Sequence, residues 1–107
     1  MKIVAVTACP AGLMHTFMAA KGLENAVKNT GDSIKVETQS ASGIAHEITQ
    51  QEVDQAEVVI LAIDISIEGR ERFNGKPILT VSTSKVLKNA SEVLEDAKKL
   101  IEVNDEK

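Results

Sequence analysis

One cysteine in this sequence lies where the surrounding residue types suit nucleophilic chemistry. Cys9 follows the apolar, β-branched run at residues 3–6, which is typical of a buried parallel strand. From Thr16 onward, apolar residues recur at positions 16, 19, 20, 23, 26 and 27, the spacing of one helical face. The pattern predicts that the thiol lies between the carboxyl end of a strand and the amino end of a helix.

That location has a chemical consequence for the thiol. The first turn of a helix carries unpaired N–H groups and the positive end of the helix dipole. Electropositive, partly exposed surroundings of this kind favour the thiolate form of a cysteine, which is the nucleophile, and the same N–H groups bind phosphate. We therefore expect Cys9 to be a catalytic nucleophile in a loop that also holds the phosphoryl group it acquires.

The residues after the thiol form the expected phosphate-binding loop, which consists of Pro10, Ala11, Gly12, Leu13, Met14, His15 and Thr16. Pro10 stiffens the start of this loop, and Gly12 permits a positive φ or a close backbone approach to an anion. Thr16 is placed to donate a hydrogen bond to the thiolate. His15 and Thr16 stand where the C-x5-R-[ST] frame of cysteine-dependent phosphatases has its arginine and its serine or threonine.

Further elements are expected to position this loop. Periodicity predicts a first helix from about residue 12 or 13 to 29, and alternation predicts a strand at 33–38, at the edge of a sheet. Residues 39–47 indicate a loop, and Thr49 with Glu52 forms the capping-box pattern of a short helix that ends near 54–55. The remaining expectations are a buried strand at 58–63, a loop with a helical turn at 65–75, a strand at 78–81, a short helix from Ser82 or Ser84 to 88, and a final helix from Ser91.

This alternation predicts a single domain over residues 1–107 with an α/β fold. We expect a three-layer, Rossmann-like arrangement with a four-stranded parallel sheet in the order 2-1-3-4 and helices on both faces. In such sheets ligands bind outside the carboxyl ends where the order reverses, here between strands one and three. Asp64 and Arg72 follow the third strand and are accessory candidates at that crevice. The alternatives are a capping role for Asp64 and a solvated charge cluster around Arg72.

Composition limits the function classes. Two phenylalanines and no tyrosine or tryptophan leave little for stacking on bases, and the net charge of −4 disfavours nucleic acid. No apolar stretch reaches the roughly 18 residues of a membrane span, and the amino end lacks a signal-peptide pattern, so we expect a cytoplasmic chain. A lone cysteine forms no internal disulfide, and we expect no metal site. His46 is expected to be a solvated loop residue.

Several segments resemble one known family in the same order. Val-Thr-Ala-Cys-Pro-Ala-Gly-Leu-Met-His-Thr-Phe-Met-Ala-Ala at 6–20 resembles the phosphocysteine loop of fructose-type enzyme IIB domains, which belong to the bacterial phosphoenolpyruvate-dependent sugar phosphotransferase system (PTS). Similar segments follow at 35–39, 56–60, 64, 72–73, 75–77 and 81–82, so the resemblance covers nearly the whole chain. The departures are Ala11 for a frequent threonine, Leu13-Met14 for Ile-Ala, and the segment 40–43 for Gly-Ser-x-Gly.

The resemblance implies a phosphoryl relay. Cys9 would accept phosphate from a phosphohistidine on an enzyme IIA protein or domain. It would pass the phosphate to fructose or a related sugar bound by the membrane permease, enzyme IIC. This implies a phosphotransferase with no cofactor besides the transient phosphate on Cys9. It would act in the cytoplasm and transiently at the inner face of the membrane, through the permease.

Three other classes share part of the pattern. A low-molecular-weight, cysteine-dependent phosphatase would fit the loop, but His15 offers fewer donors than arginine, and Asp64 is the one crevice candidate for the acid that a leaving group needs. A receiver-type signalling domain needs an acidic pair after the first strand, where this chain has Ala8 and Cys9. A redox thiol would need a C-x-x-C partner.

Overall fold

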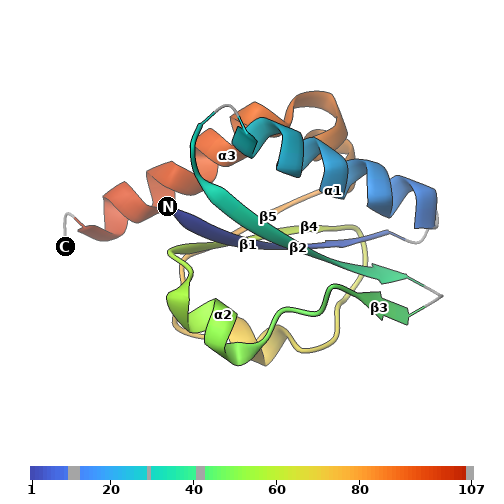
Figure 1. Ribbon diagram of the computed structural model, residues 1–107, viewed down its shortest axis with the longest axis horizontal. Coiled ribbons are helices and arrows are strands. Elements are labelled where there is room, and N and C mark those ends of the chain that lie inside the picture. Colours follow the sequence, from blue (N-terminus) through green and yellow to red (C-terminus); the bar gives the residue numbers. More distant parts are fainter. Residues whose placement is uncertain (10–12, 29, 41–42, 106–107) are drawn as a thin grey trace.

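Strands and helices alternate along the chain in the computed structural model, which describes residues 1–9, 13–28, 30–40 and 43–105 and, of residues 13–15 and 102–105, the backbone alone. The elements in Figure 1 are β1 (Lys2–Ala8), α1 (Leu13–Lys28), β2 (Ser33–Ser40), β3 (Gly43–Ala45), α2 (Gln50–Gln55), β4 (Val58–Ile63), the 3-10 helix η1 (Arg70–Phe73), β5 (Ile78–Val81) and α3 (Thr83–Asp105). The strands predicted at 58–63 and 78–81 are confirmed, and α1 matches its predicted range to within about one residue at each end.

The sheet has five strands in the order β3-β2-β1-β4-β5. The four strands β2, β1, β4 and β5 are mutually parallel, and their order is the predicted 2-1-3-4. The prediction of only four strands was wrong, because β3 pairs antiparallel with β2 inside the segment expected to be a loop. A strand of three residues is too short to show the alternation by which strands are recognised in a sequence.

The extra strand changes the setting of β2. Thr38, Gln39 and Ser40 pair with β3, so the carboxyl end of β2 is not a sheet edge as predicted. One of the buried residues of β2 is charged, because the side chain of Glu37 is fully buried. An interior strand that carries a buried carboxylate requires partners for that charge.

Helices cover both faces of the sheet, as expected for a three-layer α/β fold (Figure 1). On one face, α1 and α3 enclose a core that includes Ile3, Ala5, Leu23, Ile60, Val93 and Leu94. On the other face, the core near α2 and η1 includes Val4, Val6, Ile48, Val53, Leu61 and Phe73. β4 contributes to both cores, which explains why its sequence is apolar without interruption.

Side chains cap the starts of α2 and α3, and a third cap lies at a kink inside α3. The capping box of α2 is confirmed, because the Glu52 N–H donates to the Thr49 hydroxyl and the Glu52 side chain accepts from the Thr49 N–H. Ser82 accepts from the Lys85 N–H at the start of α3. α3 is kinked at Asn89, where φ is −160° and ψ is 81°. The second half of α3 is capped by Asn89, which accepts from the Glu92 N–H, so it begins close to Ser91, where the final helix was predicted to begin.

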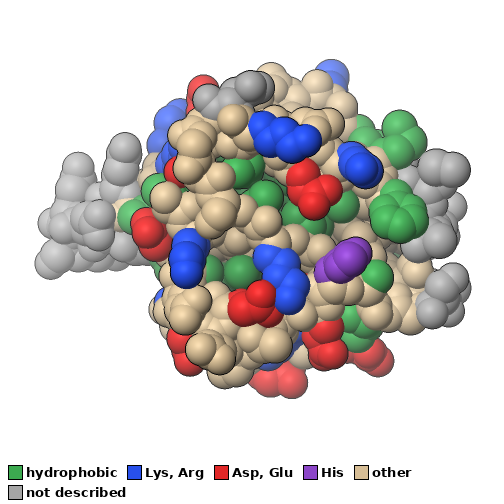
Figure 2. All heavy atoms as spheres, viewed as in Figure 1, with side chains coloured by type: hydrophobic (Ala, Val, Ile, Leu, Met, Phe, Trp, Pro, Cys, Tyr) green, Lys and Arg blue, Asp and Glu red, His purple; other side chains and the backbone are tan. Residues whose placement is uncertain are grey.

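Charged side chains of both signs are interspersed over the face shown in Figure 2. Two of the ion pairs on the described surface join Lys98 to Asp32 at 2.6 Å and Lys35 to Glu52 at 2.8 Å. The Lys98 ammonium, which bonds to the Asp32 carboxylate, is the largest cause that lowers the pKa of Asp32 to about 2. These pairs link α3 to the turn before β2 and α2 to β2. On the described part of that face, charges of neither sign predominate.

Candidate active site

Cys9 lies directly after β1, at the point where the strand order of the sheet reverses. From β1 the chain goes to β2 on one side, and it later returns as β4 on the other side. Ala8 pairs with Gln39 of β2 and with Ile63 of β4, and its carbonyl accepts a hydrogen bond from the Asp64 N–H at 2.9 Å. The predicted position of the thiol, at the topological switch point between a strand and a helix, is confirmed.

The burial of the thiol differs from what the sequence indicated. Cys9 is 6% exposed, whereas the sequence favoured partly exposed surroundings. A sulfur that reacts with a group on another protein must be reached from outside. The chemistry expected of Cys9 therefore requires the sulfur to be more exposed in a complex than it is in this structure.

A hydrogen bond holds the start of α1 against β1, close to Cys9. The Thr7 hydroxyl donates to the Thr16 carbonyl oxygen at 3.2 Å, and both residues are fully buried. This contact fixes the first turn of α1 relative to the end of the strand. It places the amino end of the helix beside the loop that contains Cys9, the arrangement that binds anions in other proteins.

The expected phosphate-binding loop lies partly outside the described residues. Pro10, Ala11 and Gly12 are not described, and the side chains of Leu13, Met14 and His15 are not described either. The backbone of residues 13–16 forms the first turn of α1. A hydrogen bond from Thr16 to the thiolate stays a prediction.

Asp64 lies near Cys9 in the folded chain, because its N–H donates to the carbonyl of Ala8, but its carboxylate points to α3. It accepts from the Thr83 hydroxyl at 2.5 Å and from the Thr83 N–H at 3.3 Å. An acidic group at a helix amino end is a stabilising cap. These contacts favour the capping role that the sequence left open for Asp64, and its role in catalysis stays a prediction.

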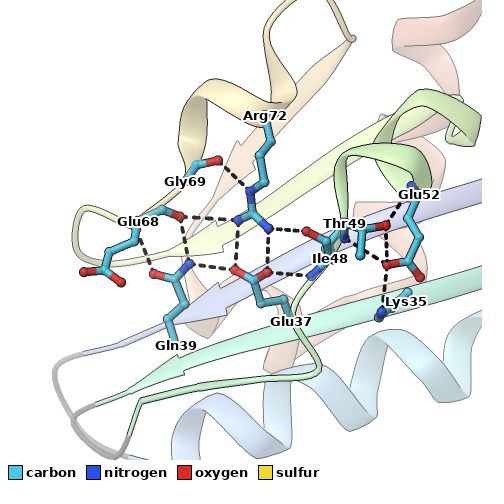
Figure 3. A network of polar contacts seen from close by, with 9 residues as sticks. All are labelled: Lys35, Glu37, Gln39, Ile48, Thr49, Glu52, Glu68, Gly69 and Arg72. Carbon is cyan, nitrogen blue, oxygen red and sulfur yellow. Dashed lines mark hydrogen bonds and ion pairs between the residues drawn. The ribbon is translucent and has the colours of Figure 1, made fainter.

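Arg72 is held in a polar network on the α2 side of the sheet (Figure 3). Its guanidinium has five N–H donors. They make five hydrogen bonds, to the Gly69, Ile48 and Glu68 carbonyl oxygens and to both carboxylate oxygens of Glu37. The guanidinium also stacks 4.9 Å from the centre of the Phe73 ring. These contacts favour a positioning role for Arg72, and a role at the phosphoryl group stays a prediction.

Glu37 is the acceptor at the centre of this network. One of its oxygens accepts from the Ile48 N–H and from Arg72, each at 2.8 Å, and the other accepts from Gln39 at 2.7 Å and from Arg72 at 3.0 Å. Burial alone would raise the pKa of Glu37, but these hydrogen bonds outweigh it, so the pKa is lowered below 4.5. The hydrogen bond to Glu37 also raises the pKa of Arg72. Glu37 is therefore a buried carboxylate that stays charged.

Sequence reasoning missed the structural importance of Glu37 and Gln39. Both were part of the segment that carried the family resemblance, but neither was singled out as a functional residue. The available signal was weak, because Glu37 occupies a polar position in a strand that alternates polar and apolar residues, where an exposed carboxylate is the ordinary expectation. The partner, Arg72, is 35 residues away, and only the fold identifies it.

A prediction tests how tightly this network is packed. Gly69 has φ +74°, and a Cβ there would lie 2.7 Å from Arg72 Nε. Gly31 has φ +78° but nothing within 4 Å of its Cβ position, so Gly31→Ala has the backbone strain without the clash. We expect Gly31→Ala to lower the free energy of unfolding by about 1–2 kcal/mol and Gly69→Ala by about 2–3 kcal/mol in urea titrations. Equal losses would show that the Arg72 side chain is free to move.

Within the described residues, no group of three or more His, Cys, Asp or Glu side chains is arranged to hold a metal ion. No helix in the described part of the chain is both long enough and apolar enough to span a membrane.

The fold and the site define a class of protein: an α/β domain with a thiol at the switch point of its sheet, beside the amino end of a helix. In such an arrangement a nucleophile lies beside a helix end of the kind that binds anions.

Comparison with known proteins identifies the family. The family model described as "PTS system, Lactose/Cellobiose specific IIB subunit" matches residues 4–96. The chain is 48% identical over 93 residues to the "PTS system fructose-like EIIB component 2" of Escherichia coli (strain K12), which covers 87% of this chain and 88% of that protein. It is 47% identical over 96 residues to the "PTS system fructose-specific EIIABC component" of Bacillus subtilis, covering 90% of this chain and 15% of that protein.

Solved structures agree with this assignment. A domain of the fructose-specific IIABC component from Borrelia burgdorferi has a TM-score of 0.85 and 48% identity, covering 90% of this chain and 91% of that one. The enzyme IIB subunit of the PTS from Escherichia coli K12 has a TM-score of 0.88 and 35% identity, covering 97% and 96%. The chain belongs to the fructose-type enzyme IIB family of the PTS, and the resemblance seen in the sequence is confirmed.

Proposed function

We propose that this chain is the phosphoryl carrier of a sugar PTS and that Cys9 carries the phosphate. The observation that supports this most is the position of Cys9, directly after β1 at the switch point and beside the start of α1. Membership of the enzyme IIB family already makes the chain a phosphotransferase component. The fructose-type relatives favour fructose or a related sugar as the final acceptor, although the matching family description names lactose and cellobiose.

The proposed reaction has two steps. In the first, the Cys9 thiolate attacks the phosphorus of a phosphohistidine on enzyme IIA, so that an S–P bond forms and the N–P bond breaks. The imidazole leaves with the electron pair and takes up a proton. In the second, a sugar hydroxyl attacks the phosphorus, so that an O–P bond forms, the S–P bond breaks, the hydroxyl proton passes to a base, and the thiolate is regenerated. The first turn of α1 would stabilise the phosphoryl charge.

The proposed partners are enzyme IIA as phosphate donor and the enzyme IIC permease with its bound sugar. A relative named EIIABC joins IIA and IIC parts to the IIB part in one polypeptide, and a relative named EIIB'BC joins a IIC part to it, which supports both partners. We infer that the chain acts in the cytoplasm and meets the permease at the inner face of the membrane.

An apolar groove beside the start of α1 supports a protein partner at this edge. Phe17, Met18 and Leu87 are 46%, 53% and 37% exposed, and they line the groove together with Lys21. Exposed apolar groups gathered in one groove are typical of protein interaction sites. The groove lies along the helix whose amino end borders the thiol.

The phosphatase alternative is less well supported. Hydrolysis of a phosphate ester would need an acid for the leaving group, and Asp64 was the candidate. Its carboxylate accepts two hydrogen bonds from Thr83 at the start of α3. Asp64 is therefore occupied as a helix cap in this structure.

One experiment tests the proposal and separates it from the alternative. The chain is incubated with labelled phosphoenolpyruvate, the general PTS proteins and an enzyme IIA partner, and peptide mapping then locates the phosphate. Permease vesicles with fructose, lactose or cellobiose identify the acceptor. Label on Cys9 that is chased onto a sugar supports the relay. Rapid release of inorganic phosphate from an aryl phosphate, without label on Cys9 from enzyme IIA, would favour the phosphatase.

A further inference from the structure

A short segment after β4 crosses the end of β1 beside the thiol. Asp64 begins this segment with its N–H bonded to the Ala8 carbonyl oxygen, and Glu68 ends it with its backbone bonded to the Gln39 side chain on β2. Because β1 lies between β4 and β2, a chain that runs from one to the other must pass the carboxyl end of β1. Two strand spacings are about 10 Å, which residues 64–68 span easily. We call residues 64–68 the crossing segment.

The backbone of the crossing segment is held from β2. The Gln39 amide makes two reciprocal bonds with Glu68: its Nε2 donates to the Glu68 carbonyl at 3.0 Å, and its Oε1 accepts from the Glu68 N–H at 2.9 Å. Arg72 adds a donor to the same carbonyl at 3.3 Å. Next to Glu68, Ile67 packs against the core on the α2 side.

The orientation of the Gln39 amide is itself fixed. Its Nε2 also donates to Glu37 at 2.7 Å, and Gln39 is only 8% exposed. Glu37 is in turn held by Arg72, so the three side chains form one connected network (Figure 3). The Glu68 carboxylate points away from this network, which therefore acts on the backbone of Glu68 and not on its charge.

We propose that Gln39 is a positioning residue for phosphoryl transfer, because it holds the crossing segment against the carboxyl end of β1 as one wall of the site around Cys9. This inference rests on the proposed function. Transfer between proteins depends on placing the reacting atoms to within about 1 Å. If the crossing segment is no longer held against β1, the phosphoryl group is misplaced and water can reach it. Water then attacks the phosphorus, the S–P bond breaks, and the products are the Cys9 thiolate and inorganic phosphate.

The test compares Gln39→Met with a matched control. Methionine keeps the length of the side chain and removes all three hydrogen bonds, whereas Gln51→Met makes the same chemical change at an exposed position of α2, outside the network. Three quantities are measured: amide hydrogen exchange at Glu68, the single-turnover rate of phosphorylation by phosphorylated enzyme IIA, and the lifetime of phosphorylated Cys9 after the donor is removed.

For Gln39→Met we expect exchange at Glu68 to be at least about tenfold faster, since the amide loses its acceptor. We also expect transfer to be about tenfold slower and the phosphocysteine lifetime to be several-fold shorter. Gln51→Met should match the unmodified chain in all three. The lifetime separates positioning from a loss of stability, because a smaller folded fraction lowers the amount of phosphoprotein without shortening its life.

Faster exchange with unchanged transfer and lifetime would overturn the positioning role and leave the proposed function intact. Unchanged exchange would overturn it too, because Gln39 would then not hold the segment. If the unmodified chain takes no label on Cys9, the proposed function itself fails, and this inference fails with it. If Gln39→Met unfolds at the assay temperature, Arg72→Lys provides the second test, since it keeps a charge beside Glu37 and loses the bonds to the Glu68 and Gly69 carbonyls.

Discussion

Replacing Cys9 by serine is expected to lower phosphoryl transfer from enzyme IIA by at least about 10³-fold, because the chain loses its nucleophile. A serine hydroxyl is a much weaker nucleophile than a cysteine sulfur and is almost fully protonated at neutral pH. Cys9 is 6% exposed, so the new hydroxyl would also be buried, at a cost of about 1–3 kcal/mol. The measurement is labelled phosphate on the chain in a single turnover, together with a urea titration.

Two companion variants make this result specific. Cys9→Ala should lose the label to the same extent, without adding a buried hydroxyl. His46→Ala should keep the full label, because the side chain of His46 is exposed and His46 lies outside the candidate site. Label that survives in Cys9→Ala and disappears in His46→Ala would mean that the phosphate is carried by a histidine, and the relay through Cys9 would be wrong.

The regular elements were predictable because each leaves a local pattern in the sequence. The apolar run of β4 and the capping box of α2 each depend on residues a few positions apart. The position of Cys9 followed from the same kind of information, since a strand pattern ends before it and a helix pattern begins after it. The parallel order also followed, because the connections between parallel strands have a fixed hand.

The features that were missed depend on residues far apart in the chain. β3 is three residues long and exists through its pairing with β2. The contacts of Arg72 were not predicted either, because its five donors are used by groups from β2, the segment before α2 and the loop before η1. The burial of Cys9 likewise depends on its surroundings in the fold. No window of neighbouring residues contains this information.

The largest effect on stability is expected for Glu37→Gln. Four N–H donors converge on the two oxygens of Glu37, from Arg72 twice, Gln39 and Ile48. A carboxylate only accepts hydrogen bonds, so it satisfies all four. In either orientation, a glutamine would place its NH2 group against two of these donors and would leave the Arg72 charge without its partner. Removing one partner of a buried ion pair costs about 3–5 kcal/mol, a large part of the 5–15 kcal/mol that stabilises a typical domain.

Glu52→Gln is the matched control. Glu52 pairs with Lys35 at 2.8 Å, but the two side chains are 35% and 37% exposed, and a glutamine oxygen can still accept from Thr49. Exposed pairs contribute about 0–1 kcal/mol, so the same chemical change should have a small effect there. Losses of similar size in the two variants would contradict the structural role assigned to the Glu37 and Arg72 pair.

The dependence on pH gives an independent check on Glu37. Its pKa is lowered in the folded state from an ordinary value of 4.5, so the stability that it contributes is fully present above about pH 4.5. Below that pH the unfolded chain binds a proton at this site while the folded chain does not, and the contribution is lost as the pH falls through the folded pKa. Urea titrations from pH 7 to pH 3 should therefore show the stability difference between the unmodified chain and Glu37→Gln narrowing below about pH 4.5.

Other acidic groups such as Asp32 are present in both proteins and cancel in this difference. A gap that stayed constant down to pH 3 would show that Glu37 binds protons equally in the folded and the unfolded chain, so that folding does not lower its pKa. The loss in Glu37→Gln would then come from the amide clash alone, and Glu37→Leu, which has no NH2 group, tests that clash.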